Sequence, residues 1–153
     1  MNDVRLKLEN FLPYRLSVVS NRVSASIAEA YSQRFGLTIP EWRVIAVLAL
    51  HPGASAAEVA ERTAMDKVAV SRAVRRLLQT GRVKREMAAG DRRRSVLELT
   101  AEGERVYRSI TPALQRYEAA LLGDFSPGER RQLEALLKRL EDRAAQLAPP
   151  RID

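Results

Sequence analysis

The stretch that decides the fold covers residues 66–103 and reads DKVAVSRAVRRLLQTGRVKREMAAGDRRRSVLELTAEG. Its first part is predicted to be a helix over Lys67–Thr80, because apolar residues recur there at three- and four-residue spacing. These apolar positions are Val70, Val74, Leu77 and Leu78. Asp66 is a typical N-terminal cap, and Gly81 is a typical helix end. The opposite face of the helix carries polar side chains: Lys67, Ser71, Arg72, Arg75 and Arg76.

The period of the pattern changes after this helix. Two short, partly alternating segments, Arg82–Met87 and Ser95–Leu99, flank the residues 88–94. Because a Gly-Asp pair between two such segments is typical of a tight turn, they are predicted to form a β-hairpin. The residues Asp91–Arg94 would then form an exposed, arginine-rich loop at its tip.

Basic charge is concentrated in the same part of the chain. Residues 62–94 contain eleven Lys or Arg and three Asp or Glu, which gives +8, whereas the whole chain carries +7. The remaining 15 basic and 16 acidic residues therefore sum to −1. A nearly neutral body with one cationic segment is typical of a nucleic-acid-binding protein.

Helices are predicted on both sides of this stretch. Three of them open with a capping-box pattern, a hydroxyl residue followed three residues later by Glu, at Thr38, Ser55 and Ser126. The predicted segments are Phe11–Phe35, Thr38–Leu50, a short helix after Ser55, Thr100 to about Leu122, and Ser126 to about Leu147. Pro112 lies inside the fourth of these, where a kink or a local break is expected.

This order predicts a mainly α protein with a small β-hairpin, an α+β arrangement. Residues 38–100 would form a winged helix-turn-helix unit, in which the hairpin is the wing. Residues 1–37 and 101–153 would form a helical dimerisation region. Their helices are long and amphipathic and are not needed to close the core of the middle unit, so they are expected to pack on a second copy of the chain.

Composition excludes several classes of function. The absence of cysteine excludes disulfides, cysteine-ligated zinc, iron–sulfur clusters and a thiol redox sensor. One histidine, scattered acids and no glycine-rich phosphate loop argue against an enzyme, a metal site and a cofactor. Apolar runs such as Val44–Leu50 are too short to span a bilayer, and the N-terminus lacks a signal core, so a cytoplasmic location is expected.

The two basic elements have different geometries. The helix Lys67–Thr80 suits a major groove, where Arg72 is the best candidate for a base contact and Arg75 and Arg76 for phosphate contacts. The arginine-rich hairpin suits a narrow minor groove. The alternative for the helix is an ordinary solvated cationic face. Asp91 either pairs with an arginine and orients the tip or serves only the turn.

At this point the sequence resembles the MarR family of bacterial transcriptional regulators. The resemblance rests on the helix opening Asp66–Arg72, on Gly81, and on the wing from Asp91 to Gly103, which fits the pattern Asp-x-Arg…Leu-Thr-x-x-Gly. The helix entry at Gly36–Trp42 extends it, and it covers nearly the whole chain. It implies a homodimer built by the terminal helices, a reading helix in the major groove, Arg93 in the minor groove, and repression relieved by a small ligand.

Together with the resemblance, the residues give a full set of expected DNA contacts. The predicted DNA-binding residues are Ser55, Lys67, Ala69, Ser71, Arg72, Arg75, Arg76, Arg92, Arg93 and Arg94, on a pseudo-palindromic operator. Ala69 is often Ser or Thr in relatives and offers no hydroxyl here, which puts one contact in doubt. Peroxide-sensing members use cysteine, so that mode is excluded.

In this family, phenolic and aromatic carboxylate effectors bind where the first, second and fifth helices meet. The corresponding candidates here are Tyr14, Arg15, Arg22, Trp42, Arg43 and His51. An arginine would neutralise the carboxylate and the aromatic residues would flank a ring. Core packing is the alternative for Trp42, and a helix C-terminal position is the alternative for His51. Residues 11–16 are similar to members that answer to hydroxycinnamate-type acids or their CoA thioesters.

A second function stays open from the residues alone. A winged helix can also be a protein- or RNA-binding module without a small-molecule effector. The low aromatic content of 5% disfavours single-stranded RNA, which binds by base stacking. A preference for structured RNA over duplex DNA would favour this alternative.

Overall fold

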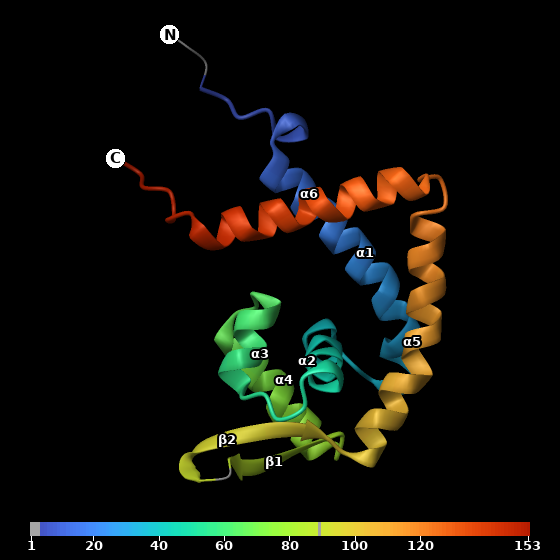
Figure 1. The fold of residues 1–153 in the computed structure, drawn as a ribbon, viewed down its shortest axis with the longest axis vertical. Coiled ribbons are helices and arrows are strands. Elements are labelled where there is room, and N and C mark those ends of the chain that lie inside the picture. The colour runs from blue at the N-terminus through green and yellow to red at the C-terminus, as the bar shows by residue number, and fades with distance from the viewer. Residues whose placement is uncertain (1–3, 89) are drawn as a thin grey trace. The chain divides into compact units, whose positions relative to one another are not determined.

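The computed structural model describes residues 4–88 and 90–153 (Figure 1). In chain order the elements are η1 (Leu8–Asn10), α1 (Leu12–Phe35), α2 (Ile39–Leu50), α3 (Ala56–Thr63), α4 (Lys67–Gln79), β1 (Val83–Ala88), β2 (Asp91–Leu99), α5 (Ala101–Leu121) and α6 (Pro127–Gln146). This confirms a mainly α fold with an antiparallel hairpin. The chain divides into two compact units, Met1–Leu114 and Gln115–Asp153, and α5 begins in the first and ends in the second. The division at residues 38 and 100 stays a prediction.

The helix starts follow the predicted caps. In α2 the Thr38 hydroxyl accepts a hydrogen bond from the Glu41 N–H (3.3 Å), while the Glu41 carboxylate accepts one from the Thr38 N–H (2.8 Å). The same reciprocal pair opens α6 at Ser126. In α3 only half of the predicted box forms. Ser55 Oγ accepts from the Glu58 N–H at 3.2 Å, but the Glu58 carboxylate pairs with Arg94 of β2 instead.

The hairpin differs from the prediction in where its second strand begins. β2 starts at Asp91 rather than at Ser95, so the expected loop residues Asp91–Arg94 belong to a strand. Between Met87 and Ala88 the partner in β2 moves from Ser95 to Asp91, which leaves residues 92–94 as a bulge. A run of charged residues shows no alternation, so the sequence pattern could not reveal this pairing.

A third segment joins the hairpin. The Gly53 N–H donates to the Leu97 carbonyl (2.9 Å), and the Leu97 N–H donates to the Ala54 carbonyl (2.9 Å). This short bridge ties the connection between α2 and α3 to β2. Since it depends on backbone groups more than 40 residues apart, no local sequence motif predicts it.

The core of the first unit draws on α1 to α5 and on the hairpin. The fully buried side chains include Tyr31 of α1, Ile45 and Leu48 of α2, Val70 and Leu77 of α4, Leu97 of β2, and Val106 and Ile110 of α5. The expectation that the flanking helices are not needed to close this core is therefore wrong for α1 and for the first half of α5. α5 also continues through Pro112, so the local break considered there is absent.

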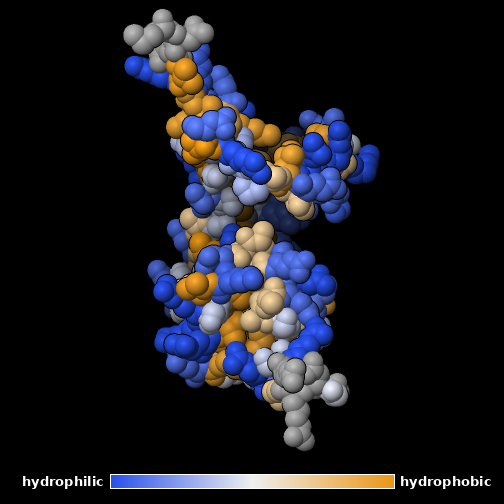
Figure 2. Space-filling model, turned by 90° about the vertical axis from the view of Figure 1, so that its left-hand side faces the viewer, coloured by the Kyte–Doolittle hydropathy of each residue, from blue (hydrophilic) through white to orange (hydrophobic). Residues whose placement is uncertain are grey.

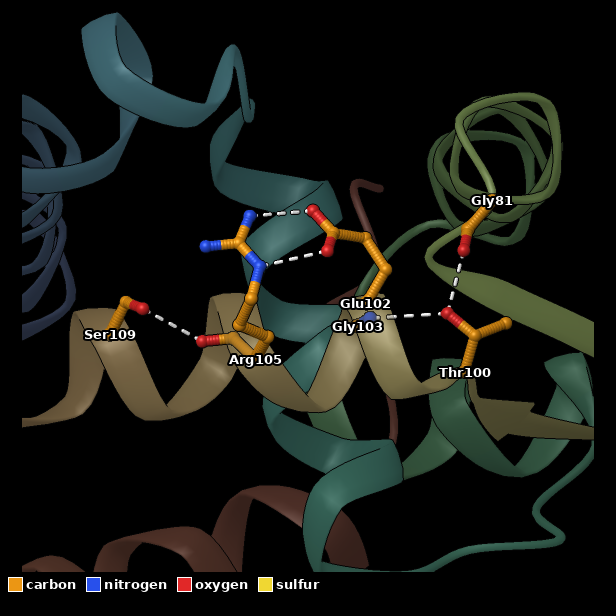
Figure 3. A network of polar contacts seen from close by, with 6 residues as sticks. All are labelled: Gly81, Thr100, Glu102, Gly103, Arg105 and Ser109. Carbon is orange, nitrogen blue, oxygen red and sulfur yellow. Dashed lines mark hydrogen bonds and ion pairs between the residues drawn. The ribbon is translucent and has the colours of Figure 1, made fainter.

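A compact corner joins α4 to α5 (Figure 3). The Thr100 hydroxyl donates to the Gly81 carbonyl (2.6 Å) and accepts from the Gly103 N–H (3.1 Å). The Thr100 N–H donates to the Arg82 carbonyl (3.0 Å). Gly103 is buried, and a Cβ added there would lie 2.0 Å from the Arg82 oxygen, so only glycine fits.

We therefore expect Gly103→Ala to destabilise the protein by about 1–3 kcal/mol or more, because the new methyl group collides with backbone rather than with a flexible side chain. Urea unfolding followed by circular dichroism measures the change. Gly128→Ala is the matched control, since the nearest atoms lie 3.9 Å from its added Cβ. The control should be neutral or more stable by up to about 1 kcal/mol. Equal stability of the two variants would contradict the steric account.

Candidate nucleic-acid interface

Helix α4 presents two opposite faces. The buried face is formed by a row with i, i+4, i+7 spacing: Val70, Val74 and Leu77. A second row with the same spacing begins two residues earlier in the sequence and consists of Val68, Arg72 and Arg75. Two residues rotate a helix by about 200°, so the second row points away from the core. The outward row, together with Lys67 and Ser71, lines a hollow on the surface.

The cations of this face have no acidic partner within the described chain. Across residues 4–88 and 90–153, the side chains of Lys67, Arg72, Arg75 and Arg76 form no ion pair and no hydrogen bond. All four are exposed. Their charge is therefore available to an anionic partner without breaking an existing interaction.

The N-terminus of α4 is already occupied. Asp66 Oδ1 accepts hydrogen bonds from the N–H groups of Val68 (2.8 Å) and Ala69 (3.1 Å). These two N–H groups are therefore not free to bind phosphate. The exposed cationic side chains of α4 are therefore its main candidates for anion binding.

Two cations of the hairpin, Lys84 and Arg94, are paired with acidic side chains. Arg94 Nη2 donates to the Glu58 carboxylate of α3. Lys84 Nζ lies 3.1 Å from Glu86 and 3.5 Å from Glu98, and the hydrogen bond with Glu86 is the main reason that the pKa of Lys84 is raised. The sequence predicts only a capping role for Glu58, because nothing local links it to an arginine 36 positions away.

Other predicted wing contacts lie beyond the described side chains. The backbone of Asp91, Arg92 and Arg93 runs in β2, but their side chains are outside the described part of the structure. The orienting role of Asp91 and the minor-groove role of Arg93 therefore stay predictions. Ser55 caps α3 and is half-buried there, with its hydroxyl oxygen engaged by the Glu58 N–H.

The candidate effector residues do not gather in one place in the first unit. Trp42 stacks against Tyr31 of α1 and Tyr107 of α5, with ring centroids 5.6 and 5.8 Å apart. Arg43 donates to the Ser24 hydroxyl at 3.1 Å. Burial raises the pKa of Tyr31, and the nearby charge of Arg43 opposes this. The stack matches the core-packing alternative for Trp42, and its tyrosine partners were not among the predicted residues.

The other candidates lie elsewhere. Tyr14, Arg15 and Arg22 are exposed on α1. Tyr14 precedes Tyr31 by 17 residues, which is about 25 Å along a helix axis. His51 caps the far end of α2, next to a hollow that it lines with Ala46, Val47, Leu50 and Arg62. The chain therefore gathers Trp42 and Arg43 near the aromatic stack and leaves Tyr14, Arg15 and His51 apart from it.

Comparison with known proteins identifies the family. The profile described as "MarR family" matches residues 35–94. The transcriptional regulator HosA of Escherichia coli is 30% identical over 104 residues, which covers 68% of this chain and 77% of HosA. The chain belongs to the MarR family. The HTH-type transcriptional repressor Rv2887 of Mycobacterium tuberculosis is 27% identical over 131 residues and covers 85% of this chain and 91% of its own length.

Solved structures agree. A MarR/EmrR family regulator from Acinetobacter sp. ADP1 superposes with a TM-score of 0.85 at 27% identity, covering 93% of this chain and 100% of the other. PcaV of Streptomyces coelicolor, solved in complex with its natural ligand, gives a TM-score of 0.78 at 25% identity and covers 92% and 99%. The protein is thus a MarR-family, DNA-binding transcriptional regulator of the repressor type, and its relatives are regulators rather than enzymes.

Two further observations concern the described residues, 4–88 and 90–153. None of their helices combines the length and the apolar composition that a membrane crossing requires. No three histidine, aspartate or glutamate side chains gather there as a metal-binding group.

Proposed function

We propose that the protein is a homodimeric repressor that reads a pseudo-palindromic DNA duplex and is released by a small aromatic or phenolic acid or its CoA thioester. The observation that carries the DNA part is the row of exposed, unpaired cations on α4. In this proposal Arg72 contacts a base edge, while Arg75 and Arg76 contact phosphates. The hairpin enters the adjacent minor groove through Arg93, and Lys67, Ser71, Ser55 and Ala69 complete the interface on the helix-turn-helix side.

The two arginines of the wing that flank Arg93 have unequal roles in this proposal. Arg94 is paired with Glu58, so it stabilises the position of the wing. A phosphate contact by Arg94 adds less binding free energy, because the pair with Glu58 must first be broken. Arg92 remains a candidate phosphate contact. A winged-helix module that binds RNA or protein is the alternative, and competition between duplex DNA and structured RNA for the full chain distinguishes it.

We expect Arg75→Ala and Arg93→Ala each to weaken binding to a duplex selected from a random pool. Each change removes about one phosphate neutralisation, so the slope of log affinity against log salt should become shallower by about one unit. Fluorescence anisotropy across a salt series measures this slope. Arg108→Ala is the control, because that side chain is 81% exposed on α5, away from α4 and the hairpin in sequence. An unchanged slope for Arg93→Ala would remove the wing from the interface.

Exposed leucines support the dimer. α6 has no buried residue, and its apolar stripe includes Leu136, Leu137 and Leu140, which are 45%, 41% and 40% exposed. A helix with such an exposed stripe needs a covering partner. Apolar side chains also gather at the surface beside the N-terminal end of α1 (Figure 2). A second copy of the chain would cover them and would place two reading helices ~34–36 Å apart, about one turn of DNA.

Leu137→Glu should shift the protein from dimer to monomer, because it places a charge where we propose that two copies meet. Sedimentation velocity over a concentration series measures the distribution of species. Arg139→Glu is the matched control, since it introduces the same side chain at an exposed position two residues away, on the opposite side of α6. A Leu137→Glu protein that remains dimeric would remove α6 from the interface.

The effector part rests on the family and on the aromatic region around Trp42. PcaV has been solved with its natural ligand, and in this chain Trp42, Arg43 and Tyr31 bring rings and a cation together where α1, α2 and α5 meet. A carboxylate would bind Arg43 or, from a second region, Arg15. Because Trp42 already stacks on two tyrosines, a ligand ring would meet its edge or displace a tyrosine.

A thermal-shift series with aromatic acids and their CoA thioesters tests this part. We expect a true effector to raise the melting temperature and to weaken DNA binding, since coupling between two ligands is reciprocal. Arg43→Ala should reduce the thermal shift of a carboxylate effector. A compound that stabilises the protein but leaves its DNA affinity unchanged would contradict the coupling.

A further inference from the structure

One apolar side chain stands in the middle of the cationic face of α4. Val68 is 56% exposed, whereas Val70 and Val74 of the same helix are each 1% exposed. Val68 is the second residue of the helix and begins the outward row that continues through Arg72 and Arg75. It thus lies almost opposite the buried row, which places it nearer the centre of the exposed face than Lys67, Ala69 or Arg76.

Val68 has no structural task in the first unit. Its side chain is absent from the core cluster and from the partly buried residues packed against it. Its backbone N–H binds Asp66, but any residue other than proline would supply that donor. Helix propensity does not favour valine at this exposed position either, because β-branched residues are weaker helix formers than alanine or leucine. The side chain instead lines the surface hollow with Lys67, Ser71, Arg72 and Arg75.

The partner of this hollow has to be anionic and has to offer an apolar group at its centre. A DNA major groove meets both demands, because phosphates border it and the C5-methyl group of thymine is the one apolar group on its base edges. RNA does not, since uracil lacks the methyl group and the major groove of an A-form helix is too deep and narrow for side chains. Charge complementarity with the four unpaired cations of α4 selects the same occupant.

We propose that Val68 is a specificity-determining residue that packs against the methyl group of a thymine in each half of the operator. This inference rests on the proposed placement of α4 in the major groove. Val68 then supplies the apolar part of base recognition, and Arg72, one helical turn further on, supplies the hydrogen-bonding part. Each half-site should therefore contain a thymine at a fixed position, related by the two-fold axis of the dimer.

The test begins with duplexes selected by the wild-type protein from a random pool. The conserved thymine in each half-site is then replaced by uracil, which removes the methyl group and leaves base pairing unchanged. Wild-type affinity should fall by about fourfold for each half-site, the effect of about one buried methyl group. Val68→Ala should bind the thymine duplex more weakly, to a similar extent, and should no longer distinguish thymine from uracil.

Two controls make the outcome specific. Uracil at a thymine outside the conserved position should leave wild-type affinity unchanged, and the melting temperature of Val68→Ala should be no lower than that of wild type, because the side chain is exposed and alanine is the better helix former. Equal wild-type affinity for the thymine and uracil duplexes would overturn the inference, as would full thymine preference in Val68→Ala. Either result leaves the proposed function intact. If no duplex is enriched, or if structured RNA is preferred, the proposed function itself fails and the inference fails with it.

Discussion

The first unit depends on the contact between Gly103 and the carbonyl group of Arg82. That oxygen accepts the Thr100 N–H, and it lies where a Cβ on residue 103 would be, at 2.0 Å. The Thr100 hydroxyl bonds both Gly81 and Gly103, so the end of α4, the start of β1, the end of β2 and the start of α5 meet at one point (Figure 3). The Leu-Thr-x-x-Gly pattern is therefore a packing requirement, and it fixes the wing relative to the reading helix.

The positive charge of residues 62–94 is divided between two kinds of cation. On α4 the cations are unpaired, so binding phosphate costs them no existing partner. On the hairpin Lys84 and Arg94 are held by Glu86, Glu98 and Glu58. Exposed pairs of this kind contribute about 0–1 kcal/mol to stability, so their main effect is to direct side chains and to lower the local positive potential. Net charge alone therefore overstates how much of the wing can neutralise DNA.

Local signals predicted most of the fold, and non-local contacts account for what was missed. Thr38, Ser126 and Asp66 begin helices because their side chains bond backbone within three residues. Three features depend instead on contacts between distant segments, which the periodicity of one segment cannot reveal. They are the early start of β2, the bridge between Ala54 and Leu97, and the ion pair between Glu58 and Arg94. On α4 the sequence identifies the cations, but Val68 lies outside the apolar period of the helix, and its exposure is evident only from the structure.

The same contacts define a physical route between the aromatic stack and the wing. Trp42 lies near the start of α2, between residues of α1 and α5, while the end of α2 is followed by Gly53 and Ala54, which bond to Leu97 of β2. Tyr107 lies one turn after Gly103 on α5. A ligand that prefers a different arrangement of the stack must shift α2 or α5, and both are fixed to the hairpin at short range. Because close-packed elements move as units, we propose that such a ligand moves the wing and the reading helix together and so changes the affinity for DNA.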